Sequence, residues 1–304
     1  MKVSVILPVY NGAGTLKETL DSLVNQTYQD FELLACIDGT KDASKDILEQ
    51  YRNRFKVLRI LENTTNRGLG PTMNRLVTET QGEYLAIAEQ DDYYYPERLA
   101  LQVAVLDKQP KVGMVSGIAE FWDGERVTMQ FPGLLVHGGQ YPEGEAMFLL
   151  NYRKQLKVAN SCMMFRKSVH IENGLYFTQH HPSIGVDWTY VLRFSLVSRV
   201  YGLHQVLVRL DRRQNRTSVT TKTEQMFKGS RELLRSFAYE YPELISKKDF
   251  NYAMRGQLSK EVNHLSGLRF VFVSLFYVFR YPFDTRFRQS LLKRIKIKLN
   301  KISV

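Results

Sequence analysis

The segment that decides the fold is Tyr84-Leu85-Ala86-Ile87-Ala88-Glu89-Gln90-Asp91-Asp92-Tyr93-Tyr94-Tyr95-Pro96-Glu97-Arg98-Leu99. Its first part is an apolar run typical of a buried strand, and two adjacent acids, Asp91 and Asp92, follow it. Carboxylate oxygens are hard ligands that suit Mg²⁺ or Mn²⁺, and such an ion keeps positions open for substrate phosphate oxygens. The segment therefore predicts a metal and phosphate site. The alternative is a solvated acidic turn before a helix that begins near Pro96.

Strands and helices alternate along the chain around this segment. Apolar runs predict strands at residues 3–10, 31–37, 57–61, 83–88 and 112–116. Helical spacing of apolar residues predicts helices over residues 16–24, 43–55, 71–80 and 96–106. Thr15 and Glu18 form the signature of a capping box at the first helix. This alternation indicates an α/β fold, with a Rossmann-like, mostly parallel sheet and helices on both faces.

Polar side chains follow three of the predicted strands. Tyr10 comes after the first strand, Asp38 after the second, and Asp91 and Asp92 after the fourth. Because ligands bind beyond the carboxyl ends of the strands in such sheets, we expect these side chains at one edge. Their convergence favours a ligand site over an acidic turn. The alternation is lost after the fifth strand, and residues 121–141 are expected to form loops of a second binding region.

The positive charge of the chain is concentrated near its end. The 304 residues carry a formal net charge of +11, and residues 251–304 alone contain eleven Lys or Arg against Glu261 and Asp284. The sequence therefore predicts a basic extension rather than a basic fold. Two isolated cysteines, Cys36 and Cys162, are too few for a disulfide framework and indicate a reducing, cytoplasmic compartment.

The basic extension predicts contact with a membrane surface. Residues 270–279 form an apolar run, but it is well short of the roughly 20 residues needed to cross a bilayer. Beyond it, basic residues surround an apolar helical stripe, which consists of Phe287, Leu291, Ile295, Leu299 and Ile302. Residues 268–304 are therefore expected to bind an anionic membrane surface. The alternative is an amphipathic helix packed on the protein. Nucleic acid is not an expected partner, because no binding module is recognisable.

Several motifs resemble, in order and spacing, those of the family-two nucleotide-sugar glycosyltransferases, which are inverting enzymes with the GT-A fold. The motifs are Leu7-Pro8-Val9-Tyr10-Asn11-Gly12, Ile37-Asp38-Gly39-Thr40-Lys41-Asp42, Gln81-Gly82-Glu83-Tyr84-Leu85, Asp91-Asp92 with Pro96-Glu97-Arg98-Leu99, Asn160-Ser161-Cys162-Met163-Met164-Phe165-Arg166-Lys167, and Gly185-Val186-Asp187-Trp188-Thr189-Tyr190-Val191-Leu192-Arg193. The resemblance covers residues 2–218. It implies a GT-A fold and a nucleotide-sugar donor.

The resemblance implies which residues bind the nucleotide of the donor. Pro8, Val9 and Tyr10 would frame the base, with the Tyr10 ring stacked on it. Asp38 would accept a hydrogen bond from the base, which suits the imide N–H of uracil or thymine. Two simpler interpretations remain open. Tyr10 can be a packed aromatic residue at a strand end, and Asp38 can belong to an ordinary Asp-Gly turn.

The resemblance also implies a metal site and a catalytic residue. Asp91 would contact the ribose, and Asp91 and Asp92 would hold a divalent metal, Mn²⁺ or Mg²⁺, that bridges the diphosphate. Asp187 would be the catalytic base, because a carboxylate near the acceptor hydroxyl can take its proton during attack on the anomeric carbon. The alternative is that Asp187 only caps the helix that follows it.

Four positions depart from the usual pattern of the family. Ile37 replaces an acid before the base-contacting Asp38, Glu89 replaces the first Asp of the metal motif, and Val186 replaces a Glu before Asp187. Asp211 stands where relatives often carry a His. The arginines around it either bind the diphosphate or are solvated surface residues: Arg209, Arg212 and Arg213.

These observations predict three parts of the chain and one function. Residues 1–118 would form the nucleotide-sugar-binding half of a GT-A domain, residues 119–220 the acceptor-binding half, and residues 221–304 a helical basic extension. The predicted activity is transfer of a sugar from a nucleoside diphosphate donor, UDP-sugar being favoured, to a saccharide acceptor. A lipid-linked acceptor in bacterial surface polysaccharide assembly (O-antigen, capsule or exopolysaccharide) would place the enzyme peripherally on the inner face of the plasma membrane. The alternatives are a non-catalytic sugar-nucleotide or membrane-binding scaffold, and a nucleotidyltransferase that would release pyrophosphate.

Overall fold

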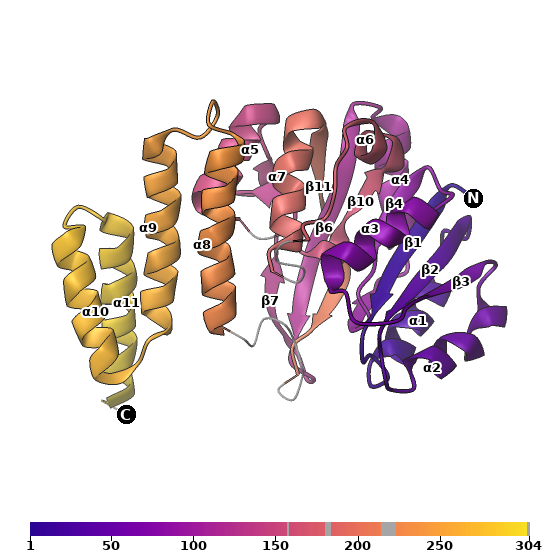
Figure 1. Ribbon diagram of the computed structural model, residues 1–304. Helices are drawn as coiled ribbons and strands as arrows, with labels where there is room; N and C mark the ends of the chain where they lie inside the picture. The colour runs from indigo at the N-terminus through magenta and orange to yellow at the C-terminus, as the bar shows by residue number, and fades with distance from the viewer. Residues whose placement is uncertain (157, 180–183, 214–222, 303–304) are drawn as a thin grey trace. The chain divides into compact units, whose positions relative to one another are not determined.

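The computed structural model describes residues 1–156, 158–179, 184–213 and 223–302, without the side chains of residue 293 and residues 295–302. Contacts divide the chain into two units (Figure 1). Unit 1 consists of Met1–Asn151 and Leu156–Thr221, and unit 2 consists of Tyr152–Gln155 and Lys222–Val304. The predicted division of residues 1–220 into donor and acceptor halves stays a prediction.

The first part of unit 1 alternates between strands and helices as the sequence predicts. Its elements are β1 Val3–Val9, α1 Leu16–Val24, β2 Phe31–Asp38, α2 Ser44–Gln50, β3 Leu58–Asn63, α3 Leu69–Glu79, β4 Tyr84–Ile87, β5 Asp92–Tyr94, α4 Arg98–Lys108 and β6 Val112–Trp122. The further elements are β7 Val127–Phe131, β8 Leu135–Val136, β9 Gly139–Gln140, α5 Gly144–Lys154, β10 Met164–Arg166, α6 Lys167–Glu172, α7 Val186–Val197 and β11 Arg199–Asp211. The end of α5, from Tyr152, is assigned to unit 2.

One nine-stranded sheet organises unit 1. Its strand order is β3-β2-β1-β4-β10-β6-β11-β5, with β7 paired to β6. The strands β3, β2, β1 and β4 are parallel, and β6 and β11 run in the same direction because the antiparallel β10 separates them from β4. Six of the nine strands therefore share one direction, which confirms the predicted mostly parallel sheet.

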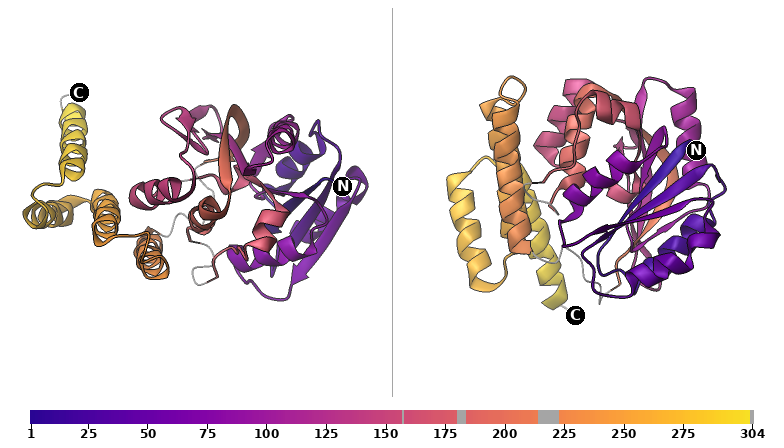
Figure 2. Two further views of the ribbon diagram at one scale, coloured as in Figure 1. Left: turned by 90° about the horizontal axis from the view of Figure 1, so that it is seen from above. Right: turned by 45° about the vertical axis from the view of Figure 1, so that its right-hand side comes forward.

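Helices cover both faces of this sheet (Figure 2). Side chains alternate between the two faces of a strand, so β1 contributes to two cores. Val3, Val5 and Leu7 pack in one core with α1, α2 and α4, whereas Ile6 packs in the other with α3 and α7. The alternating helices thus enclose the parallel strands as predicted.

Two local predictions were wrong. Thr15 does precede the first residue of α1, but its side chain makes no capping hydrogen bond. It donates instead to the carbonyl of Gly12 at 3.4 Å. The fifth predicted strand is longer than expected, since β6 continues to Trp122, and the expected loops over residues 121–141 contain β7, β8 and β9. Pairing with β11 and β7 extends β6, and such partners are remote in sequence.

The described part of unit 2 after residue 222 is helical, as the sequence predicts. Its helices are α8 Thr223–Glu240, α9 Lys247–His264, α10 Gly267–Arg280 and α11 Thr285–Ile302. Within the described residues, no helix combines the length and the apolar character that crossing a membrane requires. The apolar stripe predicted on α11 begins inside the unit, because Phe287 is buried. Its later members lie outside the described side chains: Ile295, Leu299 and Ile302.

Candidate active site

Three parallel strands bring the predicted site residues to one edge of the sheet. β1 lies between β2 and β4, with Val9 opposite Ile37 and Ile6 opposite Ile87. Tyr10, Asp38 and the acids after β4 therefore follow strand ends that point the same way. This is the edge where ligands bind in sheets of this kind.

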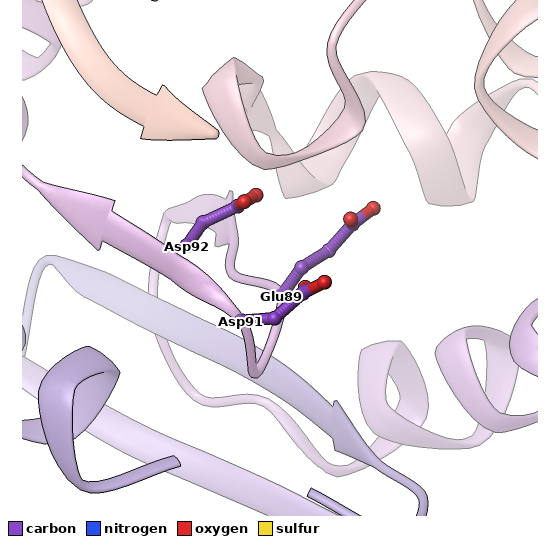
Figure 3. A group of neighbouring side chains, drawn as sticks. All are labelled: Glu89, Asp91 and Asp92. Atoms are coloured by element: carbon purple, nitrogen blue, oxygen red, sulfur yellow. The ribbon is translucent and has the colours of Figure 1, made fainter. Parts of the chain in front are cut away.

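Glu89, Asp91 and Asp92 form an acidic cluster beyond β4 (Figure 3). One carboxylate oxygen from each of them lies within 4.8 Å of the other two. Asp92 is buried, and the other two acids are half-buried. Three hard oxygen donors at this spacing fit Mg²⁺ or Mn²⁺. The cluster thus contains the predicted Asp91 and Asp92, and it adds Glu89, which the prediction of metal ligands did not include.

Buried side chains hold the backbone of the acidic cluster. The Tyr94 hydroxyl accepts a hydrogen bond from the Glu89 N–H at 2.6 Å and donates to the Glu89 carbonyl at 3.2 Å. Burial raises the pKa of Tyr94 well above its usual value, so this hydroxyl stays protonated. Arg98 stacks on the Tyr94 ring, 4.5 Å from its centroid, and donates to the Ile87 carbonyl at 2.7 Å. The side-chain amide of Asn160 donates to Oε1 of Glu89 at 3.0 Å.

Gln90 couples Tyr10 to the acidic cluster. Its side-chain amide accepts from the Tyr10 N–H and donates to the Tyr10 carbonyl, both at 2.8 Å. The Tyr10 side chain is 48% exposed, so a ring face is available for stacking. Val9 is buried in the core and Pro8 is half-buried, so these residues set the path of the backbone that carries Tyr10. Contact of all three residues with a base stays a prediction.

Asp38 is buried at the end of β2 and organises the segment before α3. Its Oδ1 accepts from Nδ2 of Asn63 at 2.7 Å and from the Arg67 N–H at 2.9 Å, and its Oδ2 accepts from the Gly68 N–H at 2.9 Å. The adjacent Gly39 has a φ of 66°, a left-handed conformation in which the backbone bends after β2. An oxygen of a carboxylate accepts up to two hydrogen bonds, so Oδ2 keeps capacity for a base N–H. That contact stays a prediction.

Asp187 lies in the first turn of α7. The residue that caps this helix is Gly185, with a φ of 61°, so the interpretation of Asp187 as the cap is wrong. Oδ1 of Asp187 accepts from the Trp188 N–H at 2.7 Å. One and two turns further along the helix, Tyr190 and Phe194 are buried in an aromatic cluster that fixes the helix on β10. The predicted role of Asp187 as a base stays a prediction.

A small pocket beside the acidic cluster joins residues that the sequence indicated, such as Arg209, to Glu18, Thr19, Tyr93 and Trp122, which it did not. Arg209 of β11 lies over two rings, 4.7 Å from the centroid of Tyr93 and 4.4 Å from that of Trp122, and it pairs with Glu18. The interpretation of Arg209 as a solvated surface residue is therefore wrong. The lining residues are Glu18, Thr19, Asp91, Asp92, Tyr93, Trp122, Arg209, Asp211 and Arg213.

Asp211, which stands at the expected His position, pairs with an arginine of the same pocket. Nη2 of Arg213 donates to Oδ2 of Asp211 at 2.6 Å, and the Arg213 N–H donates to its Oδ1 at 2.9 Å. Nε of Arg213 also donates to Oδ2 of Asp211, at 2.9 Å, so both oxygens of this buried carboxylate accept hydrogen bonds from Arg213. Arg212 stacks on the ring of Phe121 at 4.5 Å and is not among the described residues that line the pocket.

The chain matches a protein family over the part that contains the strands β1 to β10 and the acidic cluster. The model for glycosyl transferase family 2 covers residues 4–174, which is more than half of the chain. The chain therefore belongs to glycosyl transferase family 2. Asp187 and Arg209 lie beyond the matched residues.

Curated relatives are similar to parts of this chain. EpsE of Bacillus subtilis, a protein named as a glycosyltransferase, is 30% identical over 184 residues, which make up 58% of this chain and 66% of EpsE. The poly(ribitol-phosphate) beta-glucosyltransferase of Bacillus spizizenii is 39% identical over 102 residues, which make up 33% of this chain and 16% of that enzyme. The chain thus matches less than two thirds of the length of either relative.

Solved structures share the fold. S. aureus TarS 1–349 in complex with UDP-GlcNAc superposes with a TM-score of 0.64 at 23% identity, over 78% of this chain and 67% of that chain. The mannosyltransferase PcManGT from Pyrobaculum calidifontis, in complex with GDP-Man and Mn²⁺, superposes with a TM-score of 0.57 at 16% identity, over 95% of this chain and 82% of that chain. These likenesses confirm the predicted GT-A fold.

Proposed function

We propose that this chain is an inverting glycosyltransferase that uses a nucleoside diphosphate sugar, of the UDP class, and a saccharide acceptor. The observation that carries the proposal is the acidic cluster at the carboxyl edge of the sheet, coupled by Gln90 to the exposed ring of Tyr10. An aromatic ring suits a base, and carboxylates that can hold a cation suit a diphosphate. The nucleotide-sugar complexes of the two structural neighbours support this pairing.

Different residues at the edge of the sheet bind different parts of the donor. Tyr10 stacks on the base, and Asp38 accepts the imide N–H of uracil through Oδ2. Arg209 is held by two rings and one carboxylate, so its guanidinium is pre-positioned for a phosphate oxygen. Glu89, Asp91 and Asp92 would hold Mn²⁺ or Mg²⁺, which supplies positive charge to the departing diphosphate when it is bound.

Asp187 acts on the acceptor. Its carboxylate takes the proton of the acceptor hydroxyl while that oxygen forms a bond to the anomeric carbon. The bond between the anomeric carbon and the diphosphate oxygen breaks in the same displacement, and the nucleoside diphosphate leaves with the bonding electrons. Because the attack occurs opposite the leaving group, the anomeric configuration is inverted. Burial of Tyr190 and Phe194 keeps the first turn of α7 in a fixed orientation during this step.

The proposed acceptor is a lipid-linked saccharide at the inner face of the plasma membrane, in surface polysaccharide assembly. The name of the Bacillus spizizenii relative specifies a polymer, poly(ribitol-phosphate), as its acceptor. The basic composition of the C-terminal helices supports an acceptor on an anionic surface.

The test is nucleoside diphosphate release from UDP-, dTDP- and GDP-sugars, with Mn²⁺ or with chelator, and with or without membrane lipid extract. We expect release from one donor class, stimulated by Mn²⁺ and lipid. Asp187→Asn should lower turnover by about a hundredfold or more with donor affinity retained, since a positioned base contributes on this scale. Asp46→Asn, an exposed acid on α2, is the matched control.

Other outcomes identify the alternatives. Donor binding without turnover in the wild-type chain, for every donor and acceptor offered, contradicts the proposal and supports a binding scaffold. Release of pyrophosphate in place of nucleoside diphosphate supports a nucleotidyltransferase.

A further inference from the structure

The outer face of α10 is apolar and exposed. Its exposed apolar side chains are adjacent or three residues apart and are between 47% and 87% exposed: Leu268, Val271, Phe272, Leu275, Phe276 and Phe279. Phe283, just beyond the end of the helix, is 90% exposed. With 3.6 residues per turn, the positions within the helix fall on one side of it. Single exposed apolar residues are common, but a contiguous aromatic face marks an interaction site.

The opposite face of α10 fixes the orientation of the helix. Phe270, Ser274 and Tyr277 are buried, and the Tyr277 ring packs on Phe287 with 4.1 Å between ring centroids. The Tyr277 hydroxyl donates to Oδ2 of Asp284 at 2.7 Å. These contacts hold the inner face within unit 2, so rotation of the helix to bury the phenylalanines would break them. The outer face is therefore presented outward by the packing of the unit itself.

The charge of unit 2 indicates what this face binds. Unit 2 contains 19 Lys and Arg against seven Asp and Glu, a net charge of +12, whereas the whole chain carries +11. Two copies of such a unit repel each other, but an anionic bilayer attracts it. Arg269 and Arg280 are exposed at the two ends of α10, where their guanidinium groups can reach lipid phosphates while the helix lies on acyl chains.

We propose that the outer face of α10 inserts into the interface of an anionic lipid bilayer, with the helix lying in the plane of the membrane. A helix of 14 residues is about 21 Å long, which is less than the roughly 30 Å hydrocarbon core. It can therefore lie at the surface but cannot cross. This inference deepens the proposed function. Insertion of α10 would bring the chain to a lipid-linked acceptor, and this consequence rests on the proposed function. It assigns insertion to α10 rather than to the predicted stripe on α11, whose first residue is buried.

Insertion is tested with a tryptophan near the C-terminal end of α10, at the most exposed position of the face within the helix. The tryptophan fluorescence of Phe279→Trp in the full chain should be quenched by phosphatidylglycerol vesicles with brominated acyl chains. Tyr239→Trp is the matched control, because Tyr239 is 90% exposed on α8 of the same unit. The native Trp122 and Trp188 contribute equally to both variants. Quenching of Phe279→Trp above the control supports the proposal, and equal quenching in both variants overturns it.

Binding itself is tested by flotation of the full chain with vesicles. Phe276→Ser combined with Phe279→Ser should weaken binding to phosphatidylglycerol vesicles by roughly tenfold for each phenylalanine, since this follows from the free energy of burying such a side chain. Tyr239→Ser should bind like the wild-type chain. Wild-type binding to phosphatidylcholine vesicles should be much weaker.

Three results overturn the proposal. They are unchanged binding of the double variant, equal binding to both lipids, and a wild-type dimer that the double variant loses without any vesicle binding. Sugar transfer is not required for vesicle binding. An inactive chain that binds through α10 therefore contradicts the proposed function alone, and an active chain that does not bind contradicts this inference alone.

Discussion

Asp92 joins the acidic cluster to the sheet. It is the first residue of β5, its neighbour Asp91 lies in the turn before that strand, and the backbone partner of Asp92 on β11 is Leu210. The Thr19 hydroxyl donates to the Asp92 carbonyl at 2.8 Å. A carboxylate is costly to bury without compensating charge or hydrogen bonds. These contacts fix the backbone, so the position of the Asp92 carboxylate does not depend on a flexible loop.

The cluster gives a prediction for metal affinity. Asp92→Asn removes one negative charge from the three acids and should weaken Mn²⁺ binding by about tenfold to a hundredfold or more, since changes even beyond the ligands have effects of this size. Isothermal titration of the full chain with Mn²⁺ in the presence of UDP measures the affinity. Asp46→Asn, an exposed acid on α2, should leave it unchanged. Equal affinities for wild type and Asp92→Asn would exclude Asp92 as a ligand.

An element can be predicted from the sequence when the contacts that form it are between residues close together in the sequence. β1 to β4 and the helices between them are predicted because each has its own apolar period. β5 is not, because three residues become a strand only through pairing with β11, which begins more than a hundred residues later. The same distinction separates the site residues that the sequence predicts from those that it does not. Asp91 and Asp92 are adjacent in sequence, whereas Glu18, Trp122 and Arg209 meet only after the sheet has formed.

The contact between α6 and α7 gives a prediction for stability against pH. His170 on α6 is buried among aromatic rings, and its Nδ1 lies 2.8 Å from the Tyr190 hydroxyl on α7. Burial lowers the pKa of His170 from 6.5 to about 4. The unfolded chain therefore binds more protons than the folded chain between these values, and the free energy of unfolding should fall as the pH falls through this window.

The expected loss from His170 is about 3 kcal/mol between pH 6.5 and 4, from the size of the shift. Urea denaturation at several pH values measures it. Other groups titrate in the same range, so the comparison is with His170→Gln, which should lose stability less steeply over this window. Parallel pH profiles of the two proteins would show that His170 does not carry the effect.

At the scale of the whole molecule, the two units differ in charge. Unit 2 carries +12, so unit 1 is left with −1. The sequence predicts this asymmetry and a membrane contact, because charge is additive along the chain. It does not predict which helix exposes its apolar face. Both α10 and α11 carry apolar residues at helical spacing. The packing of Tyr277 on Phe287 buries one face of α10 and the start of the α11 stripe, and it leaves the opposite, apolar face of α10 exposed.

The charge asymmetry predicts that salt distinguishes two kinds of acceptor. Raising the ionic strength from about 0.1 to 1 M shortens the Debye length from about 10 to 3 Å, which screens the attraction of unit 2 for anionic lipid. We expect nucleoside diphosphate release with a lipid-linked acceptor in phosphatidylglycerol vesicles to fall by about tenfold or more, since each basic residue near the surface contributes on the order of 1 kcal/mol. Release with a soluble saccharide acceptor should change much less, because unit 1 is nearly neutral. Equal salt sensitivity with both acceptors would place the effect in the active site, where we propose that Arg209 binds the diphosphate, and would contradict a role for the membrane surface.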